Sequence, residues 1–234
     1  MIAFIVFFTQ FTSAIHGQVY PNTFITFRDT VYLQSRSAHD LLRFYTAAKR
    51  DITDSLTGAA MYLALARCEY LMGIAYKTEN KTSEAAAYFE QGITWSENSL
   101  AAAMTSEGYL LLGSGISFIC QINTSYGLRN HRKIEENAQR SLEINPDNLM
   151  AQHLMASFYI LAPWPIGNVQ RGERMLREIL NHNYLSLSQD DLFNIYLILQ
   201  AACLKQRKNQ EALLWQQRGE ALYPTNNFIS MLVK

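Results

Sequence analysis

Small and aromatic residues recur along the chain with a spacing that fits two helices packed face to face. The clearest stretch is residues 69–93, and its recurring positions are Gly73, Tyr76, Ala85, Phe89 and Gly92. Helices joined by a short turn approach closely only where both carry small side chains. We therefore expect Gly73 to face Ala85, with the aromatic rings beside that contact and Gly92 leaving room for the next helix.

Weaker copies of this helix pair are expected on both sides of it. Upstream we expect a helix at residues 40–53, and downstream we expect helices at residues 101–121, 132–146, 169–180, 192–204 and 209–222. Met155 and Tyr159 indicate one more helix, which ends before residue 162. Three connections are longer than a simple turn needs, namely residues 122–130, 162–168 and 181–190. The pattern predicts an all-α fold with little or no β-sheet.

These units resemble the tetratricopeptide repeat (TPR) over about residues 40–226. The resemblance implies antiparallel helix pairs stacked as a superhelix or solenoid, with first helices lining a concave groove and second helices facing outward. It divides the chain into a signal peptide at 1–17, an N-terminal extension at 18–38 and a TPR-like domain at 39–234. A repeat of this kind specifies a fold more than a function.

The resemblance also implies which side chains face the groove. The inward positions carried over to this chain are Arg67, Tyr70, Ile74, Lys77, His153, Ser157, Ile160, Asn194 and Leu197. They give an apolar groove with a basic end and are the candidate partner-binding residues. A second interpretation stays open, in which a short, tightly curled array packs these residues against each other.

Trp164 is a further candidate because of the turn that carries it. It stands between Pro163 and Pro165 in the connection 162–168. Both prolines fix their own φ, and a proline also restricts the residue before it, so the turn is stiff. Trp164 either flanks one mouth of the groove as a contact residue or packs on the next unit as a structural staple.

Charge and motifs exclude several classes of protein. Lys and Arg number 20, as do Asp and Glu, so the chain lacks the basic footprint of a general nucleic-acid binder. The three cysteines form no CxxC, the five histidines no i, i+4 pair, and no catalytic or phosphate-binding motif occurs. We expect no enzymatic activity, no metal and no cofactor.

The first 17 residues differ from the repeats. They are apolar and contain no Lys or Arg, and the first residue of either kind in the chain is Arg28. This segment predicts a secretory signal peptide, although the usual basic start is missing, and hence an exported, periplasmic or secreted protein. The uncharged stretches 108–128 and 149–170 carry polar residues or prolines, so we interpret them as buried helices rather than transmembrane spans.

Two functions fit these observations. The first is a non-catalytic scaffold that recognises a protein partner in a concave groove. The second is a periplasmic carrier of apolar small molecules, because export, all-helical repeats and apolar inner faces are also similar to the T-component of tripartite ATP-independent periplasmic (TRAP) transporters. That second resemblance is one of architecture only.

Overall fold

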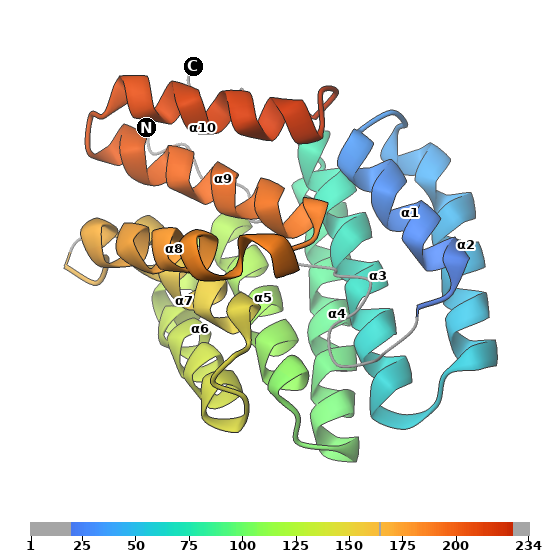
Figure 1. The fold of residues 1–234 in the computed structure, drawn as a ribbon. Helices are drawn as coiled ribbons and strands as arrows, with labels where there is room; N and C mark the ends of the chain where they lie inside the picture. The colour runs from blue at the N-terminus through green and yellow to red at the C-terminus, as the bar shows by residue number, and fades with distance from the viewer. Residues whose placement is uncertain (1–19, 164, 227–234) are drawn as a thin grey trace.

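A computed structural model describes residues 20–163 and 165–226 of the chain, and this part is all-helical (Figure 1). It contains ten α-helices and one 3-10 helix, with no strand among these residues. The elements are α1 (Asn22–Leu33), α2 (Ala38–Ser55), α3 (Gly58–Thr78), α4 (Thr82–Ala102), α5 (Ser106–Ile122), α6 (Thr124–Ile144), α7 (Leu149–Leu161), α8 (Val169–Asn183), η1 (Tyr184–Ser186), α9 (Gln189–Lys205) and α10 (Asn209–Leu222). The predicted all-α class is confirmed.

Side-chain caps define where many of these helices begin. The capping residues, whose side-chain oxygens accept hydrogen bonds from backbone N–H groups of the first turn, are Ser37, Thr105, Asn123, Asn148, Asn168 and Ser188. Such a cap satisfies a donor that has no partner inside the helix and stabilises the helix by about 1 kcal/mol. At Ser188 the cap is reciprocal, because the Asp191 carboxylate in turn accepts from the Ser188 backbone.

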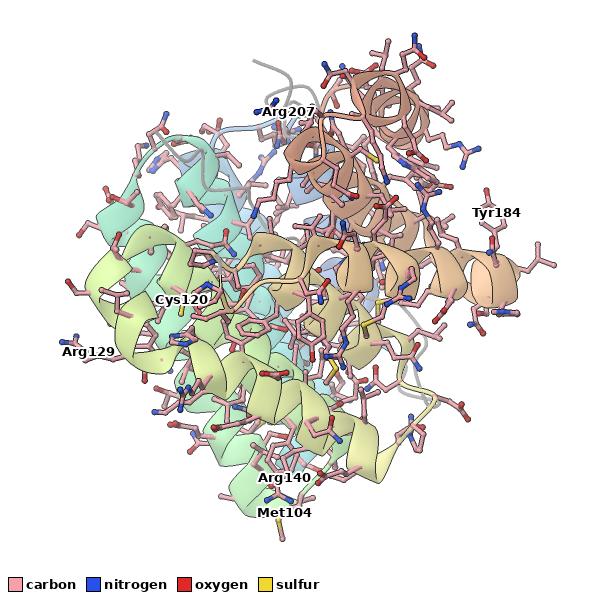
Figure 2. All side chains as sticks on the ribbon, turned by 90° about the vertical axis from the view of Figure 1, so that its left-hand side faces the viewer. Met104, Cys120, Arg129, Arg140, Tyr184 and Arg207 are labelled. Carbon is pink, nitrogen blue, oxygen red and sulfur yellow. The ribbon has the colours of Figure 1, made fainter. Side chains whose placement is uncertain are left out.

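Adjacent helices pack as pairs, and the first helices of successive pairs also touch. The pairs are α1–α2, α3–α4, α5–α6, α7–α8 and α9–α10, and α1, α3, α5, α7 and α9 form the inner series. Figure 1 shows α2, α3 and α4 running up and down the view, whereas α8, α9 and α10 lie across it. The outer helix α6 points Arg129 and Arg140 away from the body of the protein (Figure 2).

Several boundaries differ from those expected. Residues 18–38, predicted as an extension, contain α1, which completes the upstream unit by pairing with α2. The connection expected at 122–130 is helical from Thr124 onward, since Asn123 caps α6, so its extra residues lengthen that helix. Most of the expected connection 181–190 is also helical, as the end of α8, η1 and the start of α9.

The close contacts of the first predicted unit use aromatic rings rather than two small residues. A Cβ added to Gly73 would lie 2.3 Å from the Phe89 ring, and one added to Gly92 would lie 2.2 Å from the Tyr70 ring. Phe89 also stacks on Phe118 of α5, with ring centroids 4.8 Å apart. The glycines therefore accommodate rings from within their own helix pair, and one of those rings continues the packing into the next pair.

The two ends of the array meet. Tyr32 of α1 stacks on Tyr223 just after α10, with centroids 5.3 Å apart, and meets Phe193 of α9 edge-on at 6.2 Å. The Asn226 side chain donates to the Tyr32 carbonyl at 2.7 Å, and the Asn194 amide donates to the Tyr32 hydroxyl at 3.0 Å. These contacts join the first helix pair to the last one and to the residues that follow it.

Within the described residues no helix has the length and apolar character needed to cross a membrane. Most of α5 and α7 is buried, including residues 150–151 and 153–160 of α7, whereas the end of the uncharged stretch 108–128 lies in α6 and exposes Leu128.

We predict that Gly172→Ala destabilises the protein by roughly 1–3 kcal/mol through overpacking. The new methyl group would lie 2.5 Å from the Ala156 carbonyl oxygen, a backbone atom that cannot rotate away. Urea denaturation measures the loss, and the exposed Arg174→Ala on the same helix should stay within about 0.5 kcal/mol of wild type. Equal stability of the two variants would mean that α7 and α8 are not in close contact here.

Candidate functional site

The predicted groove positions lie mostly in the interior of the array. Eight of the ten candidates are buried, namely Arg67, Tyr70, Ile74, His153, Ser157, Ile160, Asn194 and Leu197. Lys77 is partly exposed, and Trp164 falls outside the described residues, as do residues 1–17. The inner helices therefore pack these side chains among themselves, which is the second interpretation left open above.

Arg67 is the centre of a buried polar network that links three inner helices. Its guanidinium pairs with the Glu107 carboxylate of α5 at 2.5 Å and donates to the hydroxyl of Tyr20. The second Glu107 oxygen accepts from the Asn148 amide at 3.0 Å, and Asn148 is the cap of α7. Removing one member of such a buried pair costs about 3–5 kcal/mol, so this network fixes α3, α5 and α7 relative to each other.

Tyr70 also connects units rather than facing a groove. Its hydroxyl donates to the Leu111 carbonyl of α5 at 2.9 Å and lies 3.1 Å from the Ser96 hydroxyl of α4. Burial raises the pKa of this phenol, so it remains a donor at all ordinary pH values.

Among the described residues no acidic side chain forms an ion pair with Lys77. Its ammonium donates to the Gln121 amide oxygen of α5 at 2.6 Å. The loss of hydration lowers the pKa of this amine from 10.5 to about 7. The basic end predicted for the groove is thus a lysine whose charge is easily lost near neutral pH.

The inner faces of α7 and α9 bring His153, Ser157 and Asn194 together. The His153 Nε2 atom lies 3.5 Å from the Ser157 hydroxyl, and burial lowers the pKa of His153 from 6.5 to about 4. Three buried side-chain atoms of these two helices have no hydrogen-bond partner among the described residues, namely His153 Nδ1, Asn194 Oδ1 and Asp191 Oδ1. Native proteins rarely leave such atoms unsatisfied, so they mark where water or a ligand would be stabilised.

A solvent-open hollow lies elsewhere, between the outer helices α2 and α4, with α3 at its base. Its volume is about 370 Å³, and its lining residues are Tyr45, Lys49, Glu69, Ala87, Tyr88, Gln91 and Trp95. The Glu69 side chain is only 1% exposed. Its carboxylate accepts hydrogen bonds from the Lys49 ammonium at 2.6 Å and from the Tyr45 hydroxyl at 2.8 Å. A buried negative charge therefore faces a cavity that solvent can enter.

Aromatic rings form the walls of this hollow. Tyr88 meets Tyr45 edge-on at 5.7 Å and stacks on Tyr76 at 5.3 Å, while Trp95 stacks on Tyr62 at 5.7 Å. Burial and the neighbouring Glu69 carboxylate raise the pKa of Tyr45, which keeps its hydroxyl protonated as a donor. The walls are therefore held both by a ring contact within the hollow, between Tyr45 and Tyr88, and by contacts with Tyr76 and Tyr62 outside it.

The sequence carried a signal for this hollow that the repeat pattern did not use. Tyr88, Gln91 and Trp95 are spaced three and four residues apart, which places them on one face of an outer helix. Glu69 is the acidic residue of α3, a helix that is otherwise mostly apolar. An aromatic face on one helix beside an acid on the neighbouring helix is the pattern that points to this site.

One group of side chains has the spacing of metal ligands, consisting of Glu173, Cys203 and Glu211. Burial alone would raise the pKa of Glu173, but hydrogen bonds from Gln206, Arg177 and Lys208 outweigh it and lower that pKa to about 2. Burial raises the pKa of the Cys203 thiol to about 11. This group is an ion-pair cluster that joins α8 to α9 and α10.

No family model and no curated protein matches the chain, so its function has to be inferred from its own residues.

We predict that the protein loses stability as the pH falls from about 6.5 to 4 because of His153. Its folded pKa of about 4 lies below the ordinary 6.5, so over this window the unfolded chain takes up a proton that the folded chain does not. The linked loss between about pH 7 and pH 5 is on the order of 1–2 kcal/mol. Urea denaturation at both pH values measures it.

His153→Gln should remove this part of the pH dependence, whereas replacing the exposed His39 by Gln should leave it in place. An unchanged pH dependence in His153→Gln would show that His153 is not buried in its neutral form.

Proposed function

We propose that this chain is a non-catalytic binding protein, a TPR-like superhelical array that recognises a segment of a partner protein. Successive helix pairs whose inner helices contact each other support the proposal, as does the change in helix direction along the array in Figure 1. Arrays of this kind serve as binding surfaces because each unit adds side chains to a continuous face.

The hollow between α2 and α4 is the observation that carries the proposal. It is open to solvent, and side chains of two consecutive helix pairs contribute to it. Tyr88 and Trp95 are partly exposed on its walls. Tyr and Trp are the residues most enriched at binding hot spots, since they bury a large area with few rotatable bonds.

The inner positions have a supporting role in this proposal. Arg67, Tyr70 and Asn194 form hydrogen bonds or ion pairs with neighbouring helices, which keeps the units in register. His153 is neutral and inaccessible at neutral pH, which favours a structural role over general acid or base catalysis. Lys77 is the inner candidate that a partner could reach.

A small-molecule carrier similar to the TRAP T-component is the second candidate. The observation in its favour is the group of buried atoms without partners on α7 and α9, His153 Nδ1, Asn194 Oδ1 and Asp191 Oδ1. A ligand with polar groups could satisfy them after entering between the inner helices. Ordered non-protein density beside His153 in a crystal structure would favour this candidate.

We predict that the protein purified from its native cells starts at Ile15 or Gln18, because a small residue, Ala14 or Gly17, precedes each of these positions. Export would place the binding surface outside the cytoplasm. N-terminal sequencing measures the cleavage, and recovery of intact Met1 from the cytoplasm would contradict it.

We predict that a protein partner captured from native cells depends on the hollow. Wild-type protein and Tyr88→Ala are compared as baits. The variant lacks one aromatic wall of the hollow, so we expect it to capture less partner protein than the wild type by a factor of about ten or more. Tyr109→Ala is the matched control, since Tyr109 is a partly exposed tyrosine outside the hollow. Equal capture by all three baits would contradict a binding role for this site.

A further inference from the structure

We infer that the hollow binds an arginine side chain of the partner protein, which takes the place of Lys49 against the buried Glu69 carboxylate. This inference rests on the proposed binding function and names the chemistry of the partner. It follows from what already occupies the site, from how exposed that occupant is, and from the chemistry and size of the space beside it.

The first step is that the site already holds a cation. The Lys49 ammonium lies 2.6 Å from Glu69 Oε1, 2.9 Å from the Tyr45 hydroxyl and 4.9 Å from the centre of the Tyr45 ring. Because the Glu69 side chain is almost fully buried, its charge needs a positive partner. A carboxylate and the negative faces of aromatic rings together select a cation over an anion or a neutral group.

The second step is that Lys49 is a replaceable occupant. Its side chain is 30% exposed, whereas the Glu69 side chain is 1% exposed, so the lysine covers the carboxylate from the solvent side. A lysine that leaves the site regains its flexible stem and the strong hydration of its ammonium. Exchange for another cation also keeps the charge of the site unchanged, which avoids an unpaired buried carboxylate.

The third step is that a guanidinium suits the remaining space better than a second ammonium. Glu69 presents two oxygens that both accept hydrogen bonds now, and arginine pairs with a carboxylate through two parallel N–H groups. Its flat, weakly hydrated head stacks on aromatic rings, and Tyr88 and Trp95 stand on the wall of α4. The volume of about 370 Å³ leaves room for the aliphatic stem as well.

Nearby charges are compatible with this assignment. Lys81 lies over the ring of Tyr76, behind the wall formed by Tyr88, but it pairs with Glu79 at 2.7 Å. Gln91 on the rim is neutral and exposed. Once Lys49 turns outward, Glu69 is the charged group that lines the hollow.

The test uses two capped tripeptides, acetyl-Ala-Arg-Ala-amide and the same peptide with citrulline in place of arginine. Citrulline has nearly the same shape and no charge. In calorimetric titrations of the full chain we expect the arginine peptide to bind at least tenfold more tightly than the citrulline peptide. Glu69→Gln and Trp95→Ala should each weaken it at least tenfold, and the control Tyr109→Ala should leave it unchanged.

Two substitutions of Lys49 should change the affinity for the arginine peptide in opposite directions. Lys49→Met removes the competing ammonium and should tighten binding of the arginine peptide at least tenfold. Lys49→Arg places a guanidinium in the site permanently and should weaken the same peptide at least tenfold, so it remains informative if Lys49→Met does not fold. Equal binding of the arginine and citrulline peptides, or changes at Lys49 in the opposite directions, would overturn the inference.

The outcome separates this inference from the proposed function. If Tyr88→Ala loses the captured partner while the arginine and citrulline peptides bind equally, the hollow binds a partner but not through arginine. If the peptides behave as expected and no partner is captured, the hollow recognises arginine but the function as a scaffold fails.

Discussion

Burial of the inner helices is the constraint on which the rest of the structure depends. Residues 63–75 of α3 and residues 190–203 of α9 are buried without interruption, because each inner helix is enclosed by its own partner and by its neighbours in the series. Every polar side chain on these helices must then find its partner inside the protein. The Arg67–Glu107 pair and the Tyr70–Leu111 hydrogen bond meet that requirement between pairs, and so they set the register of the array.

The same constraint explains how far the sequence could predict the fold. The spacing of small and aromatic residues predicted the pairs α3–α4 and α9–α10 closely, because those contacts lie within one unit and leave a local pattern. The contact between Tyr32 and Asn226 is not local: it joins positions 194 residues apart through single hydrogen bonds that no periodicity records. The prediction also left the first unit incomplete, because α1, which packs mainly against α2, carries no copy of the small-and-aromatic spacing that marked the other units.

The candidate site was harder to predict because inward position and accessibility are different properties. The family pattern gives the direction of a side chain, and the structure places Ile74, Ile160 and Leu197 inside as that pattern implies. Whether an inward side chain lines a groove depends on the curvature of the array, and the packing of the inner helices leaves these three buried. The hollow lies instead between two outer helices, α2 and α4, where the repeat pattern specifies no contact.

Two ion pairs with the same chemistry illustrate how environment separates a structural role from a binding role. The Arg67–Glu107 pair is enclosed, because Tyr20 and Asn148 form further hydrogen bonds with it and the arginine side chain is only 3% exposed. In the Lys49–Glu69 pair the acid is more deeply buried, with the Glu69 side chain 1% exposed against 15% for Glu107, but the base is ten times more exposed, at 30%, and lies at the edge of an open hollow. Breaking the first pair leaves a charge with no replacement within reach. The second pair can be broken and re-formed with an incoming cation, because solvent and partner reach it from the same side.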